Sequence, residues 1–114
     1  MNKVSGTDCL KMSFKISLPN DVSKLAHIFG ERQGHLPGTN ENKELLIKLA
    51  NDSHSFKGKD EYGNFWHIKI QDDGTQLWVH HRNGVINNGG LNIIPRVWNN
   101  HTGLNRNIFF DLIE

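Results

Sequence analysis

The feature that most constrains the fold is a change in hydrophobic period near Asp52. Before it, apolar side chains recur at helical spacing, as in Leu45, Leu46, Leu49 and Ala50. After it, apolar and polar residues alternate with a period of two, which is typical of strands with one buried face. The chain has 114 residues, enough for one hydrophobic core and too few for two. We therefore predict one α+β domain over residues 1–114, with helices before an antiparallel sheet.

Two helices are predicted in residues 19–52. Pro19, Asn20 and Asp21 open the first, with Asn20 as its cap, and Gly30 ends it. The second runs from about Thr39 to Asn51. We expect residues 1–18 to be a weakly ordered lead-in with one short strand at 12–18.

The sheet is predicted in residues 53–114, where turn signals separate short alternating segments. The clearest are Asp73-Gly74 and Asn83-Gly84, the second being a strong hairpin signal. The expected strands cover residues 64–70, 75–82, 85–88 and 107–113. Both N-terminal helices should pack on one face of a twisted antiparallel sheet of about four strands.

A four-residue loop at 71–74 sets the predicted register of the central hairpin. Ile70 then faces Thr75, and Ile68 faces Leu77, so that apolar residues pair with apolar residues. In this register Trp66, Ile68, Ile70, Leu77 and Val79 face the helices. The open face carries Phe65, His67, Lys69, Gln76, Trp78, His80 and Arg82.

The chemistry of this open face suits RNA. Cationic side chains bind phosphates, aromatic rings stack on unpaired bases, and an amide can read a base edge. An ordinary solvated sheet face is the competing interpretation. The predicted RNA-binding residues are His67, Lys69, Gln76, Trp78 and Thr39.

Histidine is abundant, with seven in the chain. Metal-free cleavage of RNA needs a base for the ribose 2′-hydroxyl, an acid for the leaving 5′-oxygen, and a cation for the phosphorane charge. His27 and His35 are the first candidate pair, with Arg82 and Lys69 as cations and His80 as a substitute acid or base. His35 lies in a glycine-flanked loop, which favours access, whereas His27 also fits a buried structural role. No metal or other cofactor is expected.

Composition and charge limit the remaining classes of function. Thirteen basic and twelve acidic residues nearly cancel, so any basic surface must be local. The single cysteine, Cys9, rules out an internal disulfide. No apolar run is long enough to span a membrane, and the first ten residues lack a signal-peptide core. We therefore expect any export signal to lie outside this chain.

Three blocks of sequence resemble one known family. The first contains His27-Ile28-Phe29, Gly34-His35-Leu36 and Glu41-Asn42-Lys43; the second contains Gly58, Asp60, Tyr62-Gly63-Asn64 and Trp66; the third contains Asp73-Gly74-Thr75-Gln76, Trp78-Val79, Arg82-Asn83-Gly84, Gly89-Gly90 and Pro95-Arg96. Together they resemble the bacterial toxin 28 family of polymorphic-toxin and contact-dependent growth inhibition ribonuclease domains, over about residues 25–104.

The resemblance implies a barnase, EndoU, colicin and RelE-like fold and ribonuclease activity, with transfer RNA as the substrate of similar members. It implies that the chain is the C-terminal part of a larger secreted effector that acts in the cytoplasm of a target bacterium. It also implies a cognate immunity protein as partner, and elongation factor Tu as a host factor for some members. No membrane partner is implied.

Two other interpretations stay open. A metal-dependent HNH nuclease would use His80-His81, Asn92 and His101, although a tight hairpin follows the histidine pair at once. A non-catalytic RNA- or protein-binding module would keep the open face and give His27 and His35 structural roles.

Overall fold

The computed structural model describes residues 16–107 and confirms the predicted α+β class. Predicted features at 1–15 and 108–113 lie outside the described residues. Helices α2 (Val22–Ile28) and α3 (Asn40–Ala50) precede the main sheet. Asp21, rather than Asn20, caps α2 by accepting hydrogen bonds from two backbone N–H groups. Thr39 caps α3 as expected from its place in the sequence.

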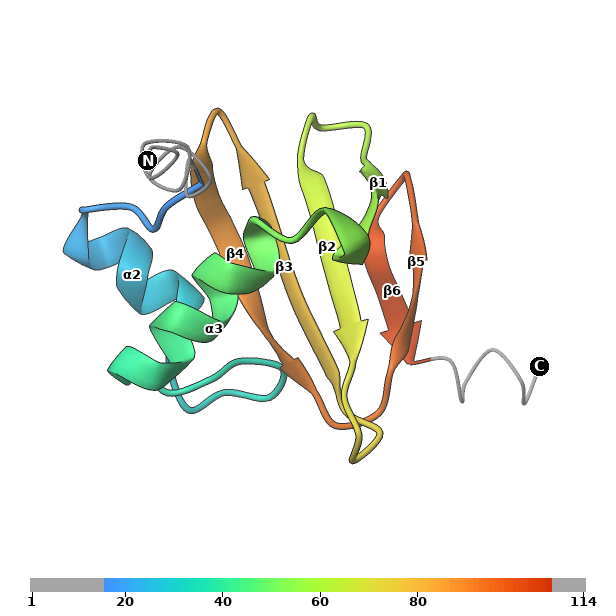
Figure 1. Cartoon of the computed structure of the whole chain (residues 1–114), viewed down its shortest axis with the longest axis horizontal. Helices are drawn as coiled ribbons and strands as arrows, with labels where there is room; N and C mark the ends of the chain where they lie inside the picture. Colours follow the sequence, from blue (N-terminus) through green and yellow to red (C-terminus); the bar gives the residue numbers. More distant parts are fainter. Residues whose placement is uncertain (1–15, 108–114) are drawn as a thin grey trace, which may run out of the picture.

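The main sheet has four antiparallel strands in the order β1-β2-β3-β4 (Figure 1). Its strands are β1 (Phe56–Lys59), β2 (Phe65–Ile70), β3 (Gln76–Arg82) and β4 (Val85–Asn92), and a 3-10 helix, η1 (Ser53–Ser55), leads into β1. Strands β5 (Arg96–Asn99) and β6 (Gly103–Asn107) form a separate hairpin on the β1–β2 side of the molecule. The sequence analysis missed β1 and β5, and it placed the last strand later than β6.

The predicted register of the central hairpin is wrong by one residue. Ile68 pairs with Trp78, not with Leu77, and Ile70 pairs with Gln76. The connecting loop covers residues 71–75, because the Asp73 carboxylate accepts hydrogen bonds from the backbone N–H and the hydroxyl of Thr75 and holds that residue in the turn.

The slip moves every side chain of β2 to the other face. Leu77 and Val79 face the helices as predicted. His67 and Lys69 lie on this same helix side, contrary to the prediction, because they pair with Val79 and Leu77. The face opposite α3 carries Trp66, Ile68 and Ile70, which were predicted to face the helices, together with Gln76, Trp78, His80 and Arg82.

The hydrophobic core lies between α3 and the sheet (Figure 1). Ile28, Leu46, Val79 and Ile86 are its most deeply buried large side chains. Burial of each stabilises the fold by roughly 2 kcal/mol. This core covers one face of the sheet. The opposite face, which is the second face of the sheet, stays available for other contacts.

The β5–β6 hairpin covers part of the second face. Gly103 packs directly on the indole of Trp66, which leaves no room for a Cβ. Gln76 ties the start of β5 to the sheet, since its amide donates to the Arg96 carbonyl at 2.9 Å and accepts from the Arg96 N–H at 3.0 Å and from Asn92 at 2.8 Å. Gln76 is therefore buried and hydrogen-bonded, and its amide does not extend to solvent as predicted.

The segment between the two helices wraps around β4 and reaches the second face. The Leu91 N–H donates to the Gly34 carbonyl at 3.1 Å. A Cβ on Gly90 would lie 2.0 Å from that same oxygen, so only glycine fits there. This close approach brings His35 over the sheet. Within residues 16–107, no helix is long and apolar enough to span a membrane.

Gly90→Ala should destabilise the fold by about 3 kcal/mol, because the new methyl group pushes the Gly34 backbone off the sheet. Gly74→Ala is the matched control: Gly74 has φ +90° but nothing lies within 4 Å of its added Cβ, so backbone strain alone should cost about 1 kcal/mol. Urea unfolding of both variants measures the difference. Equal losses would contradict the proposed close packing.

Candidate active site

A pocket of about 220 Å³ opens on the second face of the sheet, between the inter-helix segment and the β5–β6 hairpin. It brings together a histidine, two tryptophans and an arginine from four separate segments of the chain. Its lining residues are Gln33, Gly34, His35, Trp66, Trp78, Asn92, Arg96 and Leu104.

His35 is held in one orientation. Its Nδ1 lies 2.9 Å from the carbonyl oxygen of Ile28. A carbonyl only accepts hydrogen bonds, so Nδ1 carries the proton and Nε2 of the neutral ring keeps a lone pair. The ring packs edge-on against Trp78, with centroids 6.0 Å apart. A histidine arranged in this way can take a proton at Nε2.

His80 lies on the same face and is neutral near pH 7. Its ring is 4.4 Å from that of Trp66 and 6.1 Å from that of Trp78. Burial lowers the pKa of His80 to about 4, although the Asp60 carboxylate opposes that shift. Nearby positive charges lower the pKa further; they belong to His81, Arg82 and His27. The pocket at His35 is lined by none of the other predicted catalytic residues His27, Arg82 and His80.

The cation at the pocket is one that the sequence analysis did not single out. Arg96 lines the pocket from β5. Arg82, the predicted cation, is exposed and donates to the Tyr62 carbonyl at 2.8 Å. Arg96 was visible only as part of the Pro95-Arg96 motif, because β5 itself was not predicted.

Trp78 forms part of the pocket wall and is not a stacking platform as predicted. It is only 9% exposed, stacked on Trp66 at 5.7 Å between ring centroids. Its Nε1–H is buried and has no hydrogen-bond partner among the described residues. A buried N–H without a partner costs free energy, and too little of this nitrogen is exposed for a ligand atom to contact it without a rearrangement.

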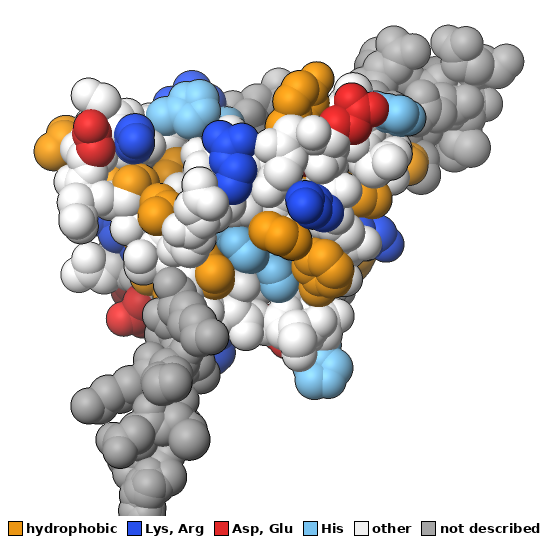
Figure 2. Space-filling view, turned by 90° about the horizontal axis from the view of Figure 1, so that it is seen from above, with side chains coloured by type: hydrophobic (Ala, Val, Ile, Leu, Met, Phe, Trp, Pro, Cys, Tyr) orange, Lys and Arg blue, Asp and Glu red, His pale blue; other side chains and the backbone are white. Residues whose placement is uncertain are grey.

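His67 belongs to a buried network on the helix side. Its Nδ1 lies 3.0 Å from the Asp52 carbonyl and 3.0 Å from the Ser55 hydroxyl, so it donates, and its Nε2 accepts from Nε2 of His81 at 3.1 Å. Burial lowers the pKa of His67, and it lowers that of His81 to about 4. Phe56 and Phe65 pack on the two rings. Figure 2 shows histidine side chains next to hydrophobic ones near the middle of the molecular surface in that view, with lysine or arginine side chains nearby.

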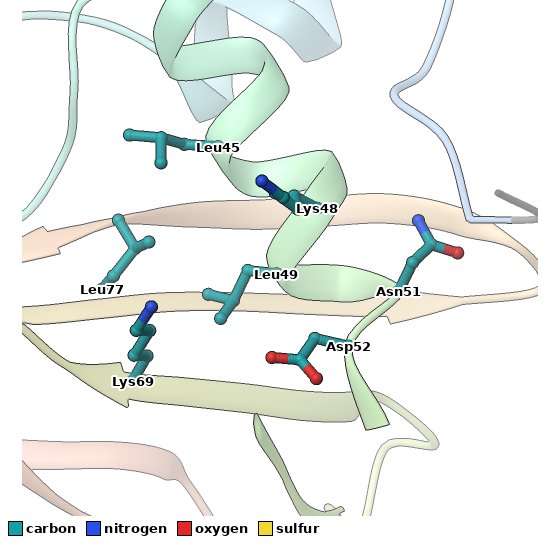
Figure 3. Close-up of a pocket in the computed structure, with 7 residues that line it drawn as sticks. All are labelled: Leu45, Lys48, Leu49, Asn51, Asp52, Lys69 and Leu77. Carbon is teal, nitrogen blue, oxygen red and sulfur yellow. The ribbon is translucent and has the colours of Figure 1, made fainter. Parts of the chain in front are cut away.

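Lys69 lines a different hollow of about 440 Å³, between α3 and the sheet (Figure 3). Leu45, Lys48 and Leu49 line it from α3, and Leu77 and Lys69 line it from the sheet. No histidine lines this hollow, so it offers no side chain that exchanges protons near pH 7. The structure therefore separates Lys69 from His35, and Thr39, which caps α3, lines neither pocket.

The residues of the alternative HNH interpretation are not brought together. His80 and His81 point to opposite faces of β3. Asn92 donates to Gln76, and His101 pairs with Glu61 at the surface. Within residues 16–107 no group of three or more metal-ligating side chains is assembled.

Comparison with protein-family models, with curated proteins and with solved structures finds no match to this chain.

The buried imidazoles make stability depend on pH. Folding lowers the pKa of His80 and His81 from about 6.5 to about 4, so the unfolded chain binds more protons between these values. The free energy of unfolding should therefore fall as the pH drops from 6.5 to 4. His80→Gln should reduce this loss by on the order of 2 kcal/mol.

Urea unfolding at several pH values measures the effect. His54→Gln is the control, because the His54 side chain is 97% exposed. A wild-type stability that stays flat over this window, or an equal slope in all three proteins, would contradict the burial of His80.

Proposed function

We propose that this chain is an endoribonuclease that cleaves RNA by transesterification, with histidine side chains as acid and base. The observation that carries the proposal is the fixed orientation of His35, whose Nδ1–H donates to Ile28 while Nε2 stays available beside Arg96 and Trp78. The pocket thus combines a proton acceptor and a cation, two of the groups that cleavage of a phosphodiester requires.

His35 is assigned as the base. Its Nε2 takes the proton of the ribose 2′-hydroxyl, and the 2′-oxygen attacks the adjacent phosphorus. The bond from phosphorus to the 5′-oxygen breaks, which leaves a 2′,3′-cyclic phosphate on one product. The leaving 5′-oxygen takes a proton from the acid and becomes a hydroxyl.

His27 is assigned as the acid. It is exposed in the last turn of α2, next to Ile28, whose carbonyl oxygen holds the His35 ring. His80 is the weaker candidate, because a pKa of about 4 leaves only about one molecule in a thousand protonated at pH 7.

Arg96 is assigned to the phosphate. A guanidinium can donate two parallel hydrogen bonds to phosphate oxygens. These hydrogen bonds strengthen as negative charge builds up on the phosphorane, which is how they would accelerate the reaction.

The biological setting is proposed on the resemblance to the bacterial toxin 28 family. In this setting the domain is the C-terminal part of a secreted effector, cuts transfer RNA in the cytoplasm of a competing bacterium, and is neutralised in its producer by an immunity protein. Elongation factor Tu stays a predicted host factor.

His35→Ala should lower the rate of RNA cleavage by about 10²–10⁴-fold, because it removes the base. The assay incubates each protein with total bacterial RNA, with and without EDTA, and maps the new ends. Wild type should produce 2′,3′-cyclic phosphate ends in both conditions. His54→Ala, at an exposed site outside the pocket, should keep full activity.

Two outcomes would overturn the proposal. Full activity in a folded His35→Ala variant would remove the assigned base, and loss of cleavage in EDTA would favour a metal-dependent nuclease. RNA binding by wild type with no cleavage would support the non-catalytic binding module.

A further inference from the structure

The pocket at His35 continues into a second, smaller hollow. This hollow has a volume of about 80 Å³ and shares Gln33, Gly34, Asn92 and Arg96 with the first. Its remaining wall is formed by Ile93 and Ile94. A ligand whose phosphate contacts Arg96 can therefore reach both hollows at once.

Two exposed isoleucines form the part of the wall that the smaller hollow does not share with the first. Ile93 is 73% exposed and Ile94 is 51% exposed, at the turn between β4 and β5. Burying these side chains under a flat ligand group would remove apolar surface from water. A nucleobase has a flat apolar face of this kind, whereas phosphate and ribose do not.

Gln33 supplies a free amide at the same place. It is exposed, and its side chain makes no hydrogen bond within the described part of the chain. The other amide of the hollow is engaged, because Asn92 donates to the buried Gln76. A free carboxamide offers both a donor and an acceptor, which matches the edge of a base.

The backbone beneath Gln33 is fixed in place. The Gly34 carbonyl accepts from Leu91, and Gly34 has φ +85°, a conformation that glycine adopts without strain. The His35 N–H also closes a turn with the Arg32 carbonyl at 3.0 Å. Gln33 is therefore carried on a preorganised turn, which lowers the entropy lost when it binds a ligand.

We propose that the smaller hollow is a nucleobase subsite, in which Ile93 and Ile94 contact the face of the base next to the cleaved phosphate and Gln33 reads its edge. The inference rests on the proposed ribonuclease function, because it assigns the base specificity of that same site. It makes Gln33 a specificity-determining residue that takes no part in proton transfer.

The test uses a 20-nucleotide RNA of random sequence, cleaved by the full chain and sequenced at the new ends. Wild type should prefer one base at a position flanking the cut. Gln33→Ala should reduce that preference about tenfold. Asn20→Ala, which removes an exposed amide that lines neither hollow, should leave the preference intact.

A binding measurement separates this inference from the proposed function. The four 3′-mononucleotides are titrated into ¹⁵N-labelled protein, and the side-chain NH₂ signal of Gln33 is followed by NMR. The subsite predicts that one nucleotide shifts this signal at a lower concentration than the others. If RNA is not cleaved but this shift occurs, the subsite stands and the ribonuclease proposal fails.

The inference itself is overturned if wild type cleaves without any base preference, or if Gln33→Ala keeps the preference of wild type. It is also overturned if none of the four mononucleotides shifts the Gln33 signal.

Discussion

The close approach of two backbones, at Gly34 and Gly90, is the contact on which the candidate site depends. Because Gly90 has no Cβ, the Gly34 carbonyl comes near enough to accept a hydrogen bond from β4. The segment between the helices is thereby held over the second face of the sheet. His35 then packs edge-on against Trp78. A side chain at position 90 would push the inter-helix segment away from the sheet and so separate the two halves of the pocket.

The two faces of the sheet carry out different tasks. The helix side holds the core and a closed pair of neutral histidines, whose tautomers are set by the Asp52 carbonyl. The opposite face leaves polar groups without partners, namely the Trp78 N–H and Nδ1 of His80. Buried polar atoms without partners are uncommon in native proteins, and departures of this kind occur mainly at functional or strained sites. This contrast is why the proposed chemistry is assigned to the pocket at His35 and not to the hollow at Lys69.

Local signals in the sequence predicted the elements better than their relative placement. The cap at Thr39 and the Asn83-Gly84 turn located α3 and the β3–β4 hairpin. Alternation in β2 could not decide the register, because Trp66 and His67 are both buried, on opposite faces. The β5–β6 hairpin covers part of the second face. The alternation of residues in β2 and β3 contains no signal that another element packs there. His35 was found from its glycine-rich loop, whereas Arg96 and Gln33 were missed because their roles depend on long-range contacts.

The central claim is that the fold presents Nε2 of His35 to the pocket by fixing the proton on Nδ1. Two-bond ¹H–¹⁵N NMR of the imidazole ring at alkaline pH distinguishes the two neutral tautomers directly. The account predicts that His35 is present as the Nδ1–H tautomer, with its proton donated to Ile28. A ring found as the Nε2–H tautomer, or averaging freely between the two, would contradict it.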